Sequence, residues 1–268
     1  MAPLLVIQEQ HPPGETLAER LASARAAGFD GLELLDAGPG RLPELQALRR
    51  DGADLPTACP SPGGWLGDFD PGRRRRAIGE LRRQLDGIAA LGGRGVVAPA
   101  AWGMFTRRLP PFREPPRDTD EDREVLLEGL SELGGHAAAA GVALLFEPLN
   151  RYEDHMVNTL AEGAELIAAA GTPGVRLLAD TFHMNIEEDD PCAALGSVAS
   201  VLGAVHLSDS NRNQPGTGHV PFDAVLSTLA HTGFSGVLSV ECRLRGDAGA
   251  AVATAGRRLR ALLDRWPG

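Results

Sequence analysis

The chain has 268 residues and a formal net charge of −10, with 43% hydrophobic and 23% charged residues. This length is sufficient for a complete α/β barrel, and the composition is typical of a globular protein. The negative charge argues against a nucleic-acid binder that neutralises phosphates, and no apolar run is long enough to span a membrane. We therefore expect a small-molecule substrate, and neither nucleic acid nor a membrane as a partner.

The cysteines and the N-terminal residues predict the compartment. Cys59, Cys192 and Cys242 are too few and too scattered for a disulfide framework or a cysteine-type zinc site. The sequence starting at Met1 has no basic leader, and its apolar run is too short for a signal peptide. We therefore expect a cytoplasmic protein.

A recurring unit organises the chain. An alanine-rich, helix-like segment ends in glycine, which suits the left-handed position after a helix, and a short apolar strand follows. Examples are residues 26–35, 91–98 and 140–147. The apolar runs lack period-2 alternation, which is typical of parallel strands covered on both faces.

Eight predicted strands alternate with eight predicted helices. We expect strands near residues 4–8, 31–35, 55–59, 95–99, 142–147, 175–180, 202–208 and 236–241. We expect helices near residues 15–27, 42–50, 73–91, 120–140, 159–170, 191–200, 222–231 and 248–265. This alternation predicts a parallel sheet, and eight units indicate a single (β/α)₈ TIM barrel, one domain over residues 1–268. No Gly-x-Gly-x-x-Gly follows the first strand, which argues against a dinucleotide-binding fold.

Four of the later strands end in residues that bind metals, namely Glu147, Asp180, His206 and Glu241. In a TIM barrel the C-terminal ends of the strands meet at one face, where functional groups gather. Three carboxylates and one imidazole suit Mn²⁺, Mg²⁺ or Co²⁺, with Zn²⁺ as an alternative. Each residue alone could be a salt-bridge partner or a helix cap, but four at equivalent positions favour a shared metal site.

The segments around these residues resemble a known family. They are Phe-Glu-Pro-Leu-Asn-Arg-Tyr-Glu (146–153), Asp-Thr-Phe-His-Met-Asn-Ile-Glu-Glu (180–188), the region 205–219 with its Pro-Gly-Thr-Gly-His, and Ser-Val-Glu (239–241). Together they are similar to the xylose isomerase-like sugar isomerase/epimerase superfamily, especially the ketose 3-epimerases and the hydroxypyruvate isomerases. These motifs cover about residues 141–245, and the eight-unit pattern extends the likeness over the whole chain.

The resemblance implies a divalent ion, most often Mn²⁺, at the four strand-end residues, with Glu147 and Glu241 as the acid/base pair. A chelated α-hydroxy carbonyl has a more acidic C–H, because the cation stabilises the enediolate. An epimerase returns the proton from a second carboxylate on the opposite face, whereas an isomerase can carry it between neighbouring carbons on one base. We therefore predict a metal-dependent isomerase/epimerase acting on a small sugar or a keto acid.

The same resemblance implies three substrate-binding residues. His183, on the loop after residue 180, would bind a substrate oxygen, and Arg212 would hold a substrate hydroxyl and stabilise negative charge. Glu153 would contact the substrate near its reacting end. The alternatives are a hydrogen bond that orients Asp180, for His183, and ordinary loop salt bridges for the other two.

Other function classes and the substrate stay open. A dehydratase acting on a polyol ketone such as an inosose would share the proton abstraction and then lose a hydroxyl group. An abasic-site endonuclease of similar geometry would need histidines where this chain has residues 33–36 and 59–62. The first loop lacks the aromatic residues common in ketose epimerases, so the sugar is not determined. Trp65 and Trp102 are candidate pocket walls, the segment 109–116 is a candidate lid, and a homodimer or homotetramer is the candidate assembly.

Overall fold

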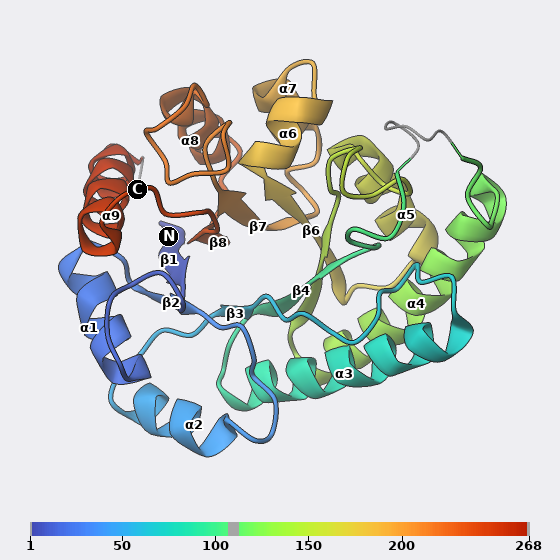
Figure 1. Ribbon diagram of the computed structural model, residues 1–268, viewed down its shortest axis with the longest axis horizontal. Coiled ribbons are helices and arrows are strands. Elements are labelled where there is room, and N and C mark those ends of the chain that lie inside the picture. The colour runs from blue at the N-terminus through green and yellow to red at the C-terminus, as the bar shows by residue number, and fades with distance from the viewer. Residues whose placement is uncertain (1, 107–112, 267–268) are drawn as a thin grey trace.

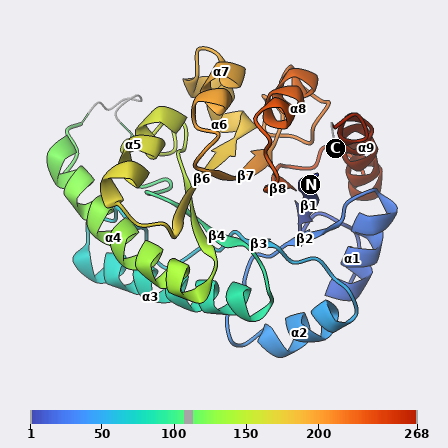
Figure 2. The same cartoon turned by 180° about the vertical axis from the view of Figure 1, so that it is seen from behind.

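The computed structural model describes residues 2–106 and 113–266, so the first half of the candidate lid, residues 109–112, lies outside the described residues. In the described part, eight parallel strands form one sheet with helices around its outside (Figure 1), and the opposite view shows the same ring (Figure 2). The strands are β1 (Leu4–Gln8), β2 (Gly31–Glu33), β3 (Thr57–Ala58), β4 (Gly95–Pro99), β5 (Ala143–Glu147), β6 (Val175–Asp180), β7 (Leu202–Leu207) and β8 (Val237–Val240). The helices are α1 (Leu17–Ala26), α2 (Leu42–Arg50), α3 (Pro71–Ala90), α4 (Thr119–Ala140), α5 (Leu160–Ala170), α6 (Thr181–Glu187), α7 (Pro191–Ser197), α8 (Phe222–His231) and α9 (Ala248–Leu263).

The sheet closes on itself almost completely. Its strand order is β2-β1-β8-β7-β6-β5-β4-β3, with every neighbouring pair parallel. Between β2 and β3, isolated parallel bridges join Gly31 to Asp54 and Leu34 to Ala58. The backbone N–H of Cys59 also donates to the carbonyl of Leu34 at 2.8 Å. The predicted (β/α)₈ barrel is therefore confirmed as a nearly closed barrel.

The structure differs from the sequence-based elements near β2, β3 and β6. The strands β2 and β3 are shorter than expected, because isolated bridges replace a ladder there. The unexpected helix α6 begins directly after β6, where Asp180 Oδ1 accepts the backbone N–H of Phe182 at 2.7 Å and caps the helix. The expectation that His183 lies on a loop is therefore wrong, because it lies in α6.

A layer of apolar side chains fills the barrel directly below the strand ends. Alternate residues of a strand share a face, so Leu145 points the same way as Glu147, and Leu178 the same way as Asp180. These leucines belong to a cluster made of Val6, Val97, Leu145, Leu178, Ala204 and Val237. The four predicted ligands therefore point into the barrel above a closed apolar floor.

None of the described helices is long and apolar enough to cross a membrane.

Candidate active site

The structure brings the four predicted metal ligands together at the C-terminal end of the barrel. Glu147 and Asp180 end β5 and β6, His206 lies in β7, and Glu241 directly follows β8. One ligand atom from each residue lies within 4.8 Å of the others, and only Glu241 is partly exposed. Among the described residues, no second group of this kind is found.

A buried carboxylate orients His206. Its Nε2 lies 3.1 Å from Glu33 Oε1, and Glu33 is fully buried. Because a carboxylate can only accept, the Nε2 proton points at Glu33, and the Nδ1 lone pair faces the four-ligand cluster. Gln8 and Thr57 also donate to Glu33, at 3.2 and 2.7 Å, and fix its position.

The donor set fits a cation. His206 Nδ1 lies 2.9 Å from Glu241 Oε2 and 3.5 Å from Glu147 Oε1. When the ring proton is on Nε2, Nδ1 is an acceptor, so these contacts bring acceptor atoms together without a hydrogen between them. His206 Nδ1 and Glu147 Oε1 are buried without a hydrogen-bond partner. Burial lowers the pKa of His206, but Glu33 and Glu241 raise it well above its usual value. The cluster therefore requires a positive charge, which either a proton on Nδ1 or a divalent ion can supply.

Arg212 is fixed against two of the ligands. Its Nη1 lies 2.5 Å from Asp180 Oδ2 and its Nη2 2.8 Å from Glu241 Oε2, and its guanidinium lies over the Phe182 ring. The residue has a positive φ of 59°, which is rare outside glycine and occurs at functional sites. The carboxylate of Asp209 builds this turn, because it accepts backbone N–H groups from residues 210, 216, 217 and 220.

The two glutamates have opposite electrostatic surroundings. Burial raises the pKa of Glu147 above its ordinary value. Burial acts in the same direction on Glu241, but His206 and Arg212 lower its pKa well below the ordinary value. The thiol of the half-buried Cys59, whose pKa burial raises, lies 3.8 Å from Glu241 Oε1. Carboxyl groups whose pKa values are pushed apart can serve as an acid and a base.

His183 presents one nitrogen to the cavity as a donor. The backbone N–H of Asn150 donates to His183 Nδ1 at 3.1 Å, so Nδ1 is an acceptor. The ring proton is therefore on Nε2, and His183 lines the main cavity together with Glu147 and Arg212. This geometry suits a donor to a substrate oxygen. His183 does not hydrogen-bond Asp180, which was the alternative reading of its position.

Glu153 links two sides of the cavity. Its Oε1 accepts from the Asn150 side chain at 2.9 Å, and its Oε2 accepts the indole N–H of Trp102 at 2.8 Å. Trp102 contacts Trp65 edge to face, with ring centroids 6.3 Å apart, and both indoles line the main cavity. This cavity has a volume of about 590 Å³, within the usual range for ligand pockets. The seven predicted site residues therefore lie at one site: four form the cluster of candidate metal ligands, and the other three line the cavity beside it.

Sequence reasoning missed Glu33 and Asn150 as contributors. Glu33 is 173 positions away from His206, and Asn150 is 33 positions away from His183. No local pattern links such pairs. The available signal in the sequence was a carboxylate within a short apolar strand, where burial is expected. A fully buried Glu requires a partner.

We expect Glu33→Gln to weaken the binding of a divalent ion. The amide can donate to His206 Nε2 and so favour the wrong tautomer, and loss of such an orienting partner typically costs about 10- to 100-fold in metal affinity. Calorimetric titration of Mn²⁺ measures this affinity. Thr57→Val, which removes one hydrogen bond to Glu33 and keeps its charge, should have a smaller effect. Equal affinities in Glu33→Gln and the unchanged protein would contradict the orienting role.

A buried aspartate supports the loop that carries Glu153. Asp154 Oδ1 accepts the backbone N–H groups of His155 and Met156, whereas its Oδ2 is buried without a partner. Burial raises the pKa of Asp154 to about 6. Because this value exceeds the unfolded value of about 3.9, the carboxyl group favours folding when protonated, and this contribution is lost as the pH rises.

We expect Asp154→Asn to become more stable, relative to the unchanged protein, as the pH rises from 4 to 7. Over this pH range the raised pKa corresponds to about 2 kcal/mol in the difference between the two free energies of unfolding, because the unfolded carboxyl group is already about half ionised at pH 4. Urea unfolding of both proteins at each pH measures this difference, and titrating groups that do not interact with Asp154 cancel in the comparison. A difference that is the same at both pH values would contradict the raised pKa.

Comparisons with known proteins agree with this geometry. Residues 21–262 match the family model of the xylose isomerase-like TIM barrel. The chain is 39% identical over 239 residues to the 3-dehydro-D-guloside 4-epimerase of Escherichia coli (strain K12), covering 87% of this chain and 89% of that protein. It is 33% identical to the L-ribulose 3-epimerase of Mesorhizobium japonicum, covering 84% of this chain and 75% of that protein.

Solved structures give the same result. The crystal structure of the E. coli 3-keto-D-glucoside 4-epimerase in its apo form superimposes with a TM-score of 0.92 at 37% sequence identity. The match covers 97% of this chain and 99% of that chain. With the family model spanning most of the sequence, the chain belongs to the family of xylose isomerase-like TIM barrels.

Proposed function

We propose that the protein is a metal-dependent sugar epimerase that inverts the carbon next to a ketone, and that its substrate is a 3-keto-glycoside inverted at C4. The observation that carries this proposal is the placement of Glu147 and Glu241 around one cation position. They come from the ends of β5 and β8, with β6 and β7 between them, and their carboxylate oxygens lie 3.5 and 2.9 Å from His206 Nδ1. Inversion requires a proton acceptor and a proton donor on opposite faces of the carbon, which this pair can provide.

The residues of the site have complementary roles in this proposal. Glu241, whose pKa is held low, removes the proton, and Glu147, whose pKa is raised, returns one to the opposite face. The roles exchange in the reverse direction. His183 donates its Nε2 proton to a substrate oxygen, and Arg212 stabilises the developing negative charge. Glu153 accepts from a substrate hydroxyl.

The donor set fits a divalent ion held by Glu147, Asp180, His206 and Glu241, with Mn²⁺ the first candidate ahead of Mg²⁺, Co²⁺ and Zn²⁺. When bound, the ion supplies Lewis-acid stabilisation of the charge that forms on the ketone oxygen. Glu33 would keep His206 in the tautomer that can ligate. Among the described residues, a multi-zinc cluster has no support, since Glu33 is engaged with His206 and the cluster of four stands alone.

The choice of a keto-glycoside is supported by the relatives and by the first loop. A 3-keto-glucoside and a 3-dehydro-guloside differ in configuration at C4, next to the ketone, so the E. coli names describe inversion at that carbon. In this chain the cavity is lined near β1 by Gln8 and Gln10, with no aromatic side chain from that loop. A polar lining at this end suits a substrate that extends beyond one sugar ring.

Proton NMR in D₂O with the Mn²⁺-loaded protein tests this function. We expect methyl 3-dehydro-D-glucoside to gain deuterium at C4 as the 4-epimer forms. Deuterium at C3 of a free ketose such as L-ribulose, with the glycoside unchanged, would instead indicate a ketose 3-epimerase. Proton transfer between C2 and C3 of hydroxypyruvate would indicate an isomerase, and loss of water from an inosose would indicate a dehydratase. Each of these three results, without turnover of the glycoside, would overturn the proposal.

A further inference from the structure

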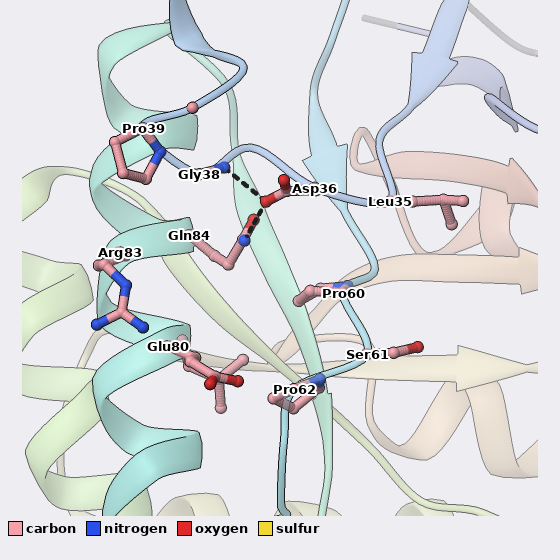
Figure 3. A pocket seen from close by; sticks show the side chains of 12 residues that line it. Leu35, Asp36, Gly38, Pro39, Pro60, Ser61, Pro62, Glu80, Arg83 and Gln84 are labelled. Atoms are coloured by element: carbon pink, nitrogen blue, oxygen red, sulfur yellow. Dashed lines mark hydrogen bonds between the residues drawn. The ribbon is translucent and has the colours of Figure 1, made fainter.

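A second cavity lies beside the main one. It has a volume of about 290 Å³ and shares Pro60 and Ser61 with the main cavity as a common wall. Its lining comes from residues 35–40 after β2, residues 60–62 after β3, and residues 80–84 of α3 (Figure 3). Both loops follow strands, so this second cavity is at the same end of the barrel as the metal ligands.

The second cavity has a rigid frame. Asp36 Oδ1 accepts from the backbone of Gly38 at 2.8 Å and from the side chain of Gln84 at 2.5 Å (Figure 3). Gln84 Oε1 also accepts the backbone N–H of Ala37 at 2.6 Å. In α3, Gly87 approaches this loop so closely that an added Cβ would lie 1.8 Å from the Ala37 carbonyl oxygen. The loop after β2 is therefore fastened to α3, and the space between them is preformed.

The lining leaves several polar groups available. Asp36 Oδ2, Glu80 Oε1 and the Arg83 guanidinium have no hydrogen-bond or ion-pair partner among the described residues. Glu80 uses only its Oε2, which accepts the backbone N–H of Gly63 at 2.7 Å. Carboxylates accept and guanidinium groups donate, so the cavity offers both kinds of partner within a small space. A neutral group rich in hydroxyls can satisfy both.

The second cavity also has apolar surface. Proline rings at positions 39, 60 and 62 line the cavity opposite or beside the polar groups (Figure 3). Flat apolar rings beside a few placed polar groups provide packing and orientation for a small ligand. A pyranose ring has the complementary surface, with C–H groups on its faces and hydroxyls around its edge.

We infer that the second cavity holds the aglycone of the substrate and that this aglycone is another sugar ring, so that the preferred substrate is a keto-disaccharide. This inference rests on the proposed function. The glycosidic bond would pass over the segment at Ser61, and Leu35 lies beside that path. Leu35 is 39% exposed, unusually high for a large apolar side chain in this protein, and its side chain points away from α3 (Figure 3). A bridging substrate would cover it.

Gly40 offers a way to block the second cavity alone. It lines the cavity, its φ is outside the left-handed region, and an added Cβ meets no atom within 4 Å. Gly40→Trp should therefore fold normally and fill the cavity. Gly135→Trp is the matched control, because Gly135 is exposed on α4 and its added Cβ is equally free. Arg83→Ala removes the available donor without adding bulk.

The test compares kcat/KM for a 3-dehydro-disaccharide, such as 3-dehydro-cellobiose, with that for methyl 3-dehydro-glucoside. We expect the disaccharide to be preferred at least about tenfold, the factor that one or two additional hydrogen bonds supply. Gly40→Trp should abolish this preference and leave the methyl glycoside unchanged, and Arg83→Ala should reduce the preference. Gly135→Trp should behave as the unchanged protein.

A preference that is absent, or that survives in Gly40→Trp, overturns the inference while leaving the proposed function intact. If neither keto-sugar is turned over, the proposed function fails, and equilibrium binding then decides the inference separately. In that case calorimetric titration with unmodified cellobiose must show binding that Gly40→Trp loses and Gly135→Trp keeps. No binding, or equal binding by all variants, overturns the inference.

Discussion

Replacing either Glu147 or Glu241 by glutamine should reduce turnover at least about a thousandfold, while the barrel stays folded. Glutamine keeps the shape of glutamate, but its amide can act neither as a general acid nor as a general base at neutral pH. A positioned acid or base contributes about 10²- to 10⁴-fold, and each residue is also a proposed ligand. Both residues are necessary for inversion, so either substitution alone should be sufficient. Stopped assays with the identified substrate measure the loss.

The design of this experiment separates chemistry from folding. Glu147 Oε1 is buried without a hydrogen-bond partner, so in the metal-free protein a neutral side chain at this position removes a buried charge and should not lower the free energy of unfolding. Circular dichroism and thermal unfolding check this expectation. Glu124→Gln, an exposed position on α4, is the matched control and should retain full activity. Full activity of Glu147→Gln or Glu241→Gln would refute the acid/base assignment.

The barrel and the positions of the four ligands were predictable because both follow from periodic features. Repeated glycine-terminated helices and buried strands indicate the (β/α)₈ architecture, and strand ends in such a barrel share one face. Once Glu147 and Asp180 end neighbouring strands, their proximity follows from the topology. The prediction depended on the order of elements and on no single distance.

The supporting contacts could not be predicted, because they depend on side chains from distant parts of the chain. The Glu33–His206 pair joins β2 to β7 across the barrel interior, and strand order alone does not say which inward side chains meet. The helix α6 was missed since Asp180 serves both as a candidate ligand and as the cap of that helix. Sequence patterns assign one role to such a residue, whereas the folded protein uses it for two.

The second cavity also could not be predicted from the sequence. In the sequence, Asp36 and Glu80 lie in different segments, and no local pattern links them. They come together because Gly87 lets α3 approach the loop after β2, and because Gln84 joins the two. The part of the site that would select a substrate is thus determined by packing between neighbouring units, whereas the reactive center follows from the strands themselves.

Removal of divalent ions should abolish activity, and Mn²⁺ or Co²⁺ should restore it. Without a cation, burial lowers the pKa of His206, but Glu33 and Glu241 raise it well above its ordinary value, which favours a proton on the imidazole of the metal-free site. A metal must displace that proton, because only the deprotonated Nδ1 can ligate. Binding should therefore release a proton and weaken as the pH falls. Dialysis against EDTA, followed by activity assays and calorimetry in buffers of different ionisation enthalpy, measures both effects.

Thermal unfolding provides a readout that does not depend on the substrate. A ligand that binds only the folded state stabilises it by about 2.7 kcal/mol at a hundredfold excess over its Kd, so Mn²⁺ should raise the Tm. Asp180→Asn should lose most of this rise, because it removes one anionic ligand and a partner of Arg212. Magnesium should act in the same direction but more weakly, since an imidazole ligand suits it less well. Unchanged activity after complete metal removal, or no bound ion after reconstitution, would rule out the metal site. The carboxylates of Glu147 and Glu241 would then have only His206 and Arg212 as cationic neighbours.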